Sequence, residues 1–374
     1  MLRGVTLVVG ARPNFMKVAP VYQALRALAP ELPVQLVHTG QHYDRQMSDV
    51  FFDELGFPRP DLILGVGSGS HGEQTARALE ALARVFEETR PRLVVVAGDV
   101  NSTLAGALAA VKLLIPVAHL EAGLRSFDWT MPEEHNRKLT DQISSLLLVH
   151  SESAIDNLAH EGIDSSTVHL VGNTMIDSLM QHIDAAKAAA PWTAFGAAAG
   201  AYGLVTLHRP SLVDDPKLLG EAVAGLADLG DVARLIFPVH PRTRAHLQQL
   251  GLDSVLEHAN VALADPLGYL DFLGLEAGAR FVLTDSGGVQ EETSALGVRC
   301  FTLRDTTERP ITVELGTNLV LGAAPSRIVE IPSLLEAARE IAPIPYWDGR
   351  AGERAAAVLL EFLARAPARD RLPV

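Results

Sequence analysis

Short apolar runs alternate with longer amphipathic or alanine-rich stretches along most of this 374-residue chain. The apolar runs are rich in Val, Leu and Ile, which is typical of strands that are buried on both faces of a parallel sheet. Strands alternating with helices predict βαβ units and therefore an α/β fold. In the first half of the chain the predicted strands are 5–9, 34–38, 93–96, 117–120 and 146–149.

This alternation pauses at residues 177–200, where a helical stretch is followed by a loose sequence of Ala, Gly and Pro. We interpret this segment as a connection between two domains. A second set of strands follows at 202–207, 234–239, 261–263, 281–283 and 300–303. Helices are predicted at 15–28, 74–89, 103–114 and 351–363, and the glycine turn at 65–69 is predicted to be a loop.

Composition narrows the class of protein. Apolar residues make up 48% of the chain and charged residues 20%, as expected for two globular domains with cores of their own. The net charge of -14 argues against nonspecific binding to nucleic acid or to an acidic membrane surface. The chain has one cysteine and therefore no internal disulfide, its first residues resemble a strand and not a signal peptide, and no apolar run reaches the ~20 residues that span a bilayer. We therefore expect a cytoplasmic protein.

Residues 281–292 read as a strand, a glycine turn and the start of a helix. Backbone N–H groups in a first helical turn lack intrahelical partners, and glycines let a phosphate approach them closely. Ser286, Gly287 and Gly288 would line such an anion site, and Glu292 would suit ribose hydroxyls. An ordinary strand-to-helix turn has the same pattern, so this segment alone does not decide between the two.

Several polar residues follow predicted strands closely, in both halves of the chain. In open parallel sheets, ligands bind at the carboxyl ends of the strands. The set therefore predicts a ligand in a cleft between two domains. Its members are Arg12, Asp99, Glu121, His208, His240 and Ser286.

Some candidate residues also have a purely structural explanation. Lys17 could lie on a solvated helix face, Asp99 could be a helix N-cap, and Glu121 could pair with Arg125. Glu133 opens a predicted helix, where an acidic residue complements the helix dipole anyway. The spacing of His, Asp and Glu matches no metal site, so we expect no metal. Neither a Walker loop nor a nucleophile elbow is present.

Taken together, the motifs resemble a known family. They run in order over nearly the whole chain, and their combination is specific although no single one is. The chain is similar to the non-hydrolysing UDP-N-acetylglucosamine 2-epimerases. The motifs are Gly10 to Lys17, Gly98-Asp99, His119 to Arg125, Pro132 to Arg137, Gly172 to Thr174, His208-Arg209, Pro238 to His240, Thr284 to Glu292 and Arg304 to Pro310.

The resemblance implies two Rossmann-like domains in the glycosyltransferase B-type architecture, with the active site in the interdomain cleft. It implies an N-terminal domain at 1–172, a UDP-binding domain at 173–350, and a helix at 351–374 that crosses back to the first domain. It further implies a homodimer without a cofactor. The first strand is indeed not followed by the glycine fingerprint of a dinucleotide site.

The implied activity is that of an isomerase in polysaccharide biosynthesis, which interconverts UDP-N-acetylglucosamine and UDP-N-acetylmannosamine. The route is anti elimination of UDP to 2-acetamidoglucal, followed by syn re-addition. The family positions imply the following roles. Catalysis falls to Asp99, Glu121, Glu133 and His208, substrate binding to Arg12, Lys17, His240, Ser286, Gly287, Gly288, Glu292 and Arg309, and allosteric binding to Gln41 and His42.

Some segments depart from the family. Residues 68–75 lack the usual form of a stretch that contributes to an activator site, which predicts weak activation by substrate. Residues 38–44 resemble instead a branch that acts on UDP-2,3-diacetamido-glucuronate. That activity remains an alternative, as do a B-type glycosyltransferase, a hydrolysing epimerase and a non-catalytic sensor of nucleotide sugars.

Overall fold

The chain folds into two compact units in a computed structural model, which describes residues 4–40, 56–338 and 340–365. The N-terminal unit comprises Met1–Ser178 together with Pro345–Val374, and the C-terminal unit comprises Leu179–Ile344. Gln41 and His42 lie outside the described residues, as does the side chain of Arg12, although its backbone begins a helix.

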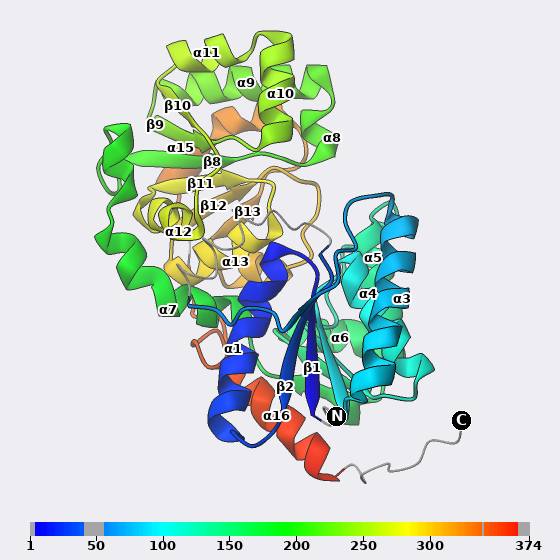
Figure 1. Ribbon diagram of the computed structural model, residues 1–374. Helices are drawn as coiled ribbons and strands as arrows, with labels where there is room; N and C mark the ends of the chain where they lie inside the picture. The colour runs from blue at the N-terminus through cyan, green and yellow to red at the C-terminus, as the bar shows by residue number, and fades with distance from the viewer. Residues whose placement is uncertain (1–3, 41–55, 339, 366–374) are drawn as a thin grey trace. The chain divides into compact units, whose positions relative to one another are not determined.

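The N-terminal unit is built on a parallel sheet in the order β3-β2-β1-β4-β5-β6-β7 (Figure 1). Five of its strands occupy the predicted apolar runs. The short β3 and β7 were not predicted. The strands are β1 (Val5–Val9), β2 (Val34–His38), β3 (Leu62–Ile63), β4 (Leu93–Ala97), β5 (Val117–Leu120), β6 (Leu146–Val149) and β7 (Val168–Leu170).

Helices connect these strands. One of them, α3, begins earlier than predicted because Ser70 and Glu73 form a capping box: the Ser70 hydroxyl accepts from the Glu73 amide, and Glu73 accepts from the Ser70 amide. The helices of this unit are α1 (Arg12–Leu28), α3 (His71–Thr89), α4 (Asn101–Lys112), α5 (Pro132–Ile143), α6 (Glu152–His160) and α16 (Ala351–Arg365), with the 3₁₀ turn η1 (Ser165–Thr167); α7 (Thr174–Ala188) begins here and continues into the C-terminal unit.

The C-terminal unit has its own parallel sheet, in the order β10-β9-β8-β11-β12-β13. Alternate residues of β8 enter two different cores: Val205 packs with α9, and Tyr202 and Leu204 pack with α12 on the other face (Figure 1). Burial on both faces explains why the strands read as unbroken apolar runs. The strands are β8 (Tyr202–Thr206), β9 (Arg234–Pro238), β10 (Val261–Ala264), β11 (Phe281–Thr284), β12 (Arg299–Thr302) and β13 (Asn318–Val320).

The helices of the C-terminal unit cover both faces of this sheet. They are α8 (Pro210–Val213), α9 (Pro216–Gly230), α10 (Pro241–Leu250), α11 (Asp253–His258), α12 (Tyr269–Gly278), α13 (Gly287–Leu296), α14 (Pro310–Glu314) and α15 (Ile331–Glu336), with the 3₁₀ turns η2 (Pro191–Phe195) and η3 (Pro325–Glu330). The predicted α/β fold with parallel sheets is confirmed. Within the described ranges, no helix is both long and apolar enough to cross a membrane.

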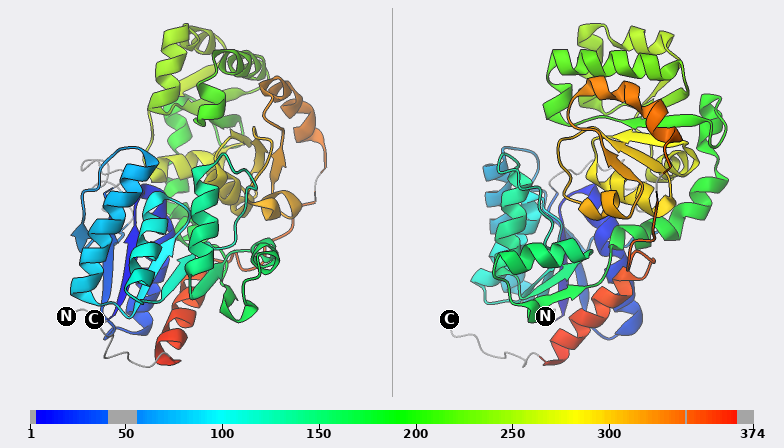
Figure 2. Two further views of the ribbon diagram at one scale, coloured as in Figure 1. Left: turned by 90° about the vertical axis from the view of Figure 1, so that its right-hand side faces the viewer. Right: turned by 180° about the vertical axis from the view of Figure 1, so that it is seen from behind.

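The last helix, α16, belongs to the N-terminal unit and lies along α1 (Figures 1 and 2). Gly352 permits this approach, because a Cβ there would lie 2.7 Å from the Pro20 backbone carbon. The start of α16 is held by Asp177, whose carboxylate accepts hydrogen bonds from the amides of Ala351 (3.0 Å) and Gly352 (2.6 Å). A buried carboxylate therefore fixes the chain's return to its first unit.

This carboxylate should make stability depend on pH. Burial raises the pKa of Asp177 to about 6, although the two amides oppose the shift. Because the folded pKa exceeds the unfolded value, the folded chain binds the extra proton, and the free energy of unfolding should fall as pH rises from about 4 to about 6. We expect Asp177→Asn to remove about 2 kcal/mol of the change in unfolding free energy between pH 4.5 and pH 7. Urea unfolding of both proteins at pH 4.5 and 7 tests it; equal slopes with pH would contradict it.

Candidate active site

The N-terminal unit places a buried ion pair at the carboxyl edge of its sheet. Lys17, on α1, lies 2.5 Å from a carboxylate oxygen of Glu121, which directly follows β5. Both side chains are more than nine-tenths buried. Gly98, at the end of the neighbouring β4, leaves room for the ammonium group, since a Cβ there would lie 2.9 Å from Lys17 Nζ. The sequence therefore supplies the pair and the space that holds it.

The backbone of Glu121 is strained. Its φ is +68°, in the left-handed region that residues with a side chain rarely adopt. The conformation is held because the Glu121 amide donates to the Leu148 carbonyl at 3.0 Å. Strain of this kind costs about 1–3 kcal/mol and is concentrated at functional sites. Glu121 does not pair with Arg125, the partner considered from sequence; Arg125 contacts Asp141 (2.7 Å) and Glu161 (2.6 Å) instead.

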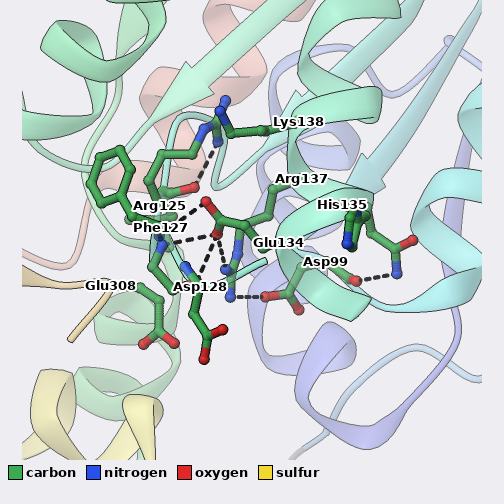
Figure 3. A network of polar contacts seen from close by, with 12 residues as sticks. Asp99, Arg125, Phe127, Asp128, Glu134, His135, Arg137, Lys138 and Glu308 are labelled. Carbon is green, nitrogen blue, oxygen red and sulfur yellow. Dashed lines mark hydrogen bonds and ion pairs between the residues drawn. The ribbon is translucent and has the colours of Figure 1, made fainter. Parts of the chain in front are cut away.

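Asp99 lies at the same edge, one strand away, because β4 and β5 are paired neighbours. Its carboxylate accepts from Arg137 at 2.6 Å, and its carbonyl accepts from Asn136 at 2.8 Å (Figure 3). It is not the N-cap of α4, which is Val100. The Asp99 carboxylate is one-fifth exposed and remains accessible to a ligand.

The adjacent acidic residues at the start of α5 have different surroundings. Glu134 is fully buried and accepts from Ser126, Phe127 and Arg137, so it fixes the loop before α5 (Figure 3). Glu133 is half-buried and has no side-chain hydrogen bond within the described part of the chain. Of the two, Glu133 is the one available for chemistry.

A buried set of polar side chains, His119, Asp141 and Arg125, supports this edge. Sequence analysis placed His119 and Arg125 in one motif but did not predict these contacts. His119, inside β5, contacts Asp141 at 2.6 Å through Nδ1 and the Gly98 carbonyl at 2.8 Å through Nε2. Asp141 in turn contacts Arg125. The imidazole thereby positions the Gly98–Asp99 turn. Only the three-dimensional structure brings these residues together, because their contacts cross between β5, α5 and the β4 turn.

In the C-terminal unit, Asp285 organises the residues after β8 and β11. Its carboxylate accepts from the amides of His208 and Arg209, both at 2.8 Å, and lies 2.9 Å from His208 Nδ1. Burial alone would raise the pKa of Asp285, but the hydrogen bond and charge of His208 and the two amides bring that pKa below its usual value. The ring of His208 is thus fixed through Nδ1 and is partly exposed. Sequence analysis placed Asp285 in a motif without assigning it this role.

The predicted anion site at Ser286, Gly287 and Gly288 forms the start of α13. Arg309 lies against it: a Cβ on Gly287 would be 2.6 Å from the guanidinium. The guanidinium also contacts Glu291 at 2.8 Å and Glu308 at 3.5 Å, and Arg309 is 7% exposed. A helix N-terminus and a held guanidinium both favour a negatively charged ligand.

Glu292 lies within α13 and accepts from the Tyr269 hydroxyl at 3.3 Å. On the preceding helix α12, Glu276 is fully buried. Burial raises the pKa of Glu292 to about 7. Glu276 lies in the last turn of α12, and its carboxylate oxygens have no hydrogen-bond partner among the described residues.

His240 is the N-cap of α10, and its Nδ1 accepts from the Arg242 amide at 3.3 Å. Its ring centroid lies 6.1 Å from that of His208. Burial, and then the charge of His208, lower the pKa of His240 and favour the neutral ring. His208 and His240 therefore form one polar edge with Asp285. Across the described residues, no group of three His, Cys, Asp or Glu side chains could hold a metal ion.

Comparison with known proteins identifies the family of the chain. A sequence model of the UDP-N-acetylglucosamine 2-epimerase family matches residues 24–360. The UDP-N-acetylglucosamine 2-epimerase of Methanocaldococcus jannaschii is 41% identical over 360 residues, which cover 95% of this chain and 98% of that protein. The UDP-2,3-diacetamido-2,3-dideoxy-D-glucuronate 2-epimerase of Pseudomonas aeruginosa is 44% identical over 327 residues, covering 86% of this chain and 89% of the relative.

A crystal structure of the M. jannaschii UDP-GlcNAc 2-epimerase in complex with UDP-GlcNAc and UDP has a TM-score of 0.87, with 41% identity over 96% of this chain and 99% of that one. The fold and these similarities define an α/β isomerase with two parallel sheets, of the glycosyltransferase B type. The chain belongs to the UDP-N-acetylglucosamine 2-epimerase family.

Proposed function

We propose that this protein interconverts UDP-N-acetylglucosamine and UDP-N-acetylmannosamine by eliminating and re-adding UDP. The observation that carries the proposal is the pair of carboxylates, Asp99 and Glu121, at adjacent strand ends, with Lys17 held against Glu121. Membership of the family supports it. Within the proposal, residues 173–350 bind UDP and residues 1–172 supply acid and base groups. Residues 351–374, which include α16, return to the first domain, and the active protein is a cytoplasmic homodimer.

The chemistry explains why two kinds of residue are needed. The C2 proton of the sugar has no adjacent carbonyl to make it acidic, so its removal must accompany loss of UDP. A base takes this proton, the C1–O bond to UDP breaks, and a C1–C2 double bond forms. An acid then protonates C2 from the opposite face while the UDP oxygen re-forms its bond to C1. This sequence needs two proton-transfer groups and cations at the departing diphosphate.

The described side chains supply both the proton-transfer groups and the groups that would stabilise the diphosphate. Asp99, Glu121 and Glu133 are the proposed acid and base groups, with the face on which each acts left open. His208 and Arg309, with the backbone of Ser286, Gly287 and Gly288, would stabilise the diphosphate, and Glu292 would accept from the ribose. Arg12, Lys17 and His240 complete the proposed binding set.

A second candidate is 2-epimerisation of UDP-2,3-diacetamido-glucuronate. The identity of 44% to the Pseudomonas aeruginosa enzyme named for that substrate favours it. It needs the same acid and base groups, so the geometry of those groups does not separate the two substrates.

Incubation in D₂O with each UDP-sugar tests both proposals. We expect UDP-N-acetylglucosamine to gain deuterium at C2 and to equilibrate with its 2-epimer, without added NAD and in the presence of EDTA, because proton transfer alone completes the reaction. Turnover of only the diacetamido-glucuronate nucleotide would establish the second candidate. Release of free sugar would indicate a hydrolase, and absence of exchange in both nucleotides would contradict both proposals.

A further inference from the structure

Gln290 is a buried polar side chain that the proposed reaction does not use. It lies on α13 and is 0% exposed. Its Nε2 donates to the carbonyl of Ser286, the N-cap residue of the same helix, at 3.2 Å. Its Oε1 accepts from the Thr307 hydroxyl at 2.6 Å and from Asn318 Nδ2 at 3.0 Å. Both the donor and the acceptor of the amide are therefore used, which no apolar side chain of this size could do.

The Thr307 hydroxyl connects Gln290 to the backbone of Arg309. Its oxygen accepts from the Arg309 amide at 3.1 Å, while its proton is donated to Gln290. The direction of these bonds follows from chemistry, because a backbone N–H can only donate and an amide oxygen can only accept. Thr307 and Arg309 lie in the loop between β12 and α14, so one hydroxyl links this loop to α13.

A second branch leads from Gln290 to the other end of the same residue. Asn318 Nδ2 donates to Thr312 Oγ1 at 3.1 Å as well as to Gln290, and the Thr312 hydroxyl donates to the Arg309 carbonyl at 2.7 Å. The Thr302 hydroxyl fixes the Asn318 amide by donating to its oxygen at 2.6 Å. Asn318, Thr312 and Thr302 are all 0% exposed, so water does not compete for these bonds.

These branches join the two groups that favour an anion in the C-terminal unit. The start of α13 is bonded to Gln290 through the Ser286 carbonyl, and the backbone of Arg309 is bonded to it through both branches. The guanidinium of Arg309 lies so close to the start of α13 that a Cβ on Gly287 would be 2.6 Å from it. Ligand-binding groups must keep their spacing, since misplacement by about 1 Å is costly.

We propose that Gln290 is a positioning residue, which joins the start of α13 to Arg309 and so sets the spacing of the groups that bind the diphosphate of a uridine nucleotide. The inference rests on the proposed function, in which those groups stabilise the departing UDP. Its consequence is that the network contributes to the affinity for a diphosphate but not to the affinity for the nucleoside alone.

The test is the affinity of the full-length protein for UDP, measured by calorimetry, and for uridine, measured by ligand-observed NMR. Thr307→Val removes the linking hydroxyl at nearly constant shape, and Thr307→Ser keeps it. Thr307 is only partly buried, so both proteins should fold. Gln290→Met removes both branches at once. Thr193→Val is the matched control, because the exposed Thr193 hydroxyl also donates to a backbone carbonyl, that of Ala190, but belongs to η2.

We expect Thr307→Val to weaken UDP binding about three- to tenfold, the usual effect of losing one or two neutral hydrogen bonds, and to leave uridine binding within about twofold. Thr307→Ser and Thr193→Val should bind both ligands like the wild type. Gln290→Met should weaken UDP binding about tenfold or more. Adding Thr307→Val to Gln290→Met should weaken it little further, because Thr307 acts through Gln290.

A merely structural network would lower thermal stability in Thr307→Val without changing the ratio of UDP affinity to uridine affinity, and that result would overturn the inference. Equal losses of UDP affinity in Thr307→Val and Thr307→Ser would also overturn it, as would fully additive losses in the double variant. If Gln290→Met does not fold, the two Thr307 variants decide alone. Failure of the proposed function is distinguishable, because the wild type would then not bind UDP.

Discussion

Replacing Glu121 by glutamine is expected to slow epimerisation by about 10²–10⁴-fold, the usual loss when a general acid or base is removed. Glutamine is nearly isosteric and keeps an oxygen for Lys17, so the fold should survive. Asp99→Asn should slow the reaction by a factor of the same order. Its fold should also survive, because Arg137 retains Glu134 as a partner. UDP binding should stay within about tenfold, or ~1.4 kcal/mol, in both variants, because in the proposal the nucleotide is held by the C-terminal unit.

Steady-state rates in both directions and UDP calorimetry provide the measurement. Glu80→Gln is a suitable control, since Glu80 forms an exposed pair with Arg84 within α3, and its loss should leave turnover unchanged. Near-normal turnover in either variant would remove that carboxylate from the mechanism. Deuterium exchange at C2 in a variant that no longer forms the epimer would show that its residue acts on only one face of the sugar.

Arg309→Ala is expected to have the largest effect on both binding and stability. The guanidinium lies at the start of α13 and contacts Glu291 and Glu308, whose side chains are 1% exposed. Its removal leaves Glu291 as a buried carboxylate without its guanidinium partner, which typically costs about 3–5 kcal/mol of unfolding free energy. UDP affinity should fall by at least about tenfold, because a charge-assisted contact to the diphosphate is lost.

A second substitution separates these two effects. In Arg309→Met with Glu291→Gln, neither charge remains, so most of the stability should return while UDP binding stays weak. Arg327→Ala is the matched control, because its pair with Glu330 is exposed and should contribute little. Unchanged UDP affinity in both Arg309 variants would mean that the diphosphate is held by other residues, His208 first among them.

The fold was largely predictable from sequence, because strands buried on both faces must be apolar throughout. Apolar runs such as 93–97 and 281–284 are typical of strands in the middle of a parallel sheet and fit few other secondary structures. The exceptions have local causes. The two residues of β3 are too few to form a pattern, and the start of α3 depends on the reciprocal hydrogen bonds of Ser70 and Glu73.

The candidate site was predictable only in part. Residues that follow strands, such as Asp99 and Glu121, can be found because parallel strands bring their carboxyl ends to one edge. Supporting residues cannot be found in this way. His119, for example, lies inside a strand and acts through a contact with Gly98, which is distant in sequence. Asp285 stood within a motif, but only its distances to His208 and Arg209 indicate what it holds.

The left-handed backbone at Glu121 bears on how this protein would respond to selection or redesign. Glycine or asparagine adopts that conformation more readily than glutamate does. Glycine would, however, leave the Lys17 ammonium buried without its carboxylate, which typically costs about 3–5 kcal/mol, more than the strain of about 1–3 kcal/mol that it relieves. A library screened only for thermal tolerance should therefore retain glutamate at position 121, although its backbone conformation disfavours that residue.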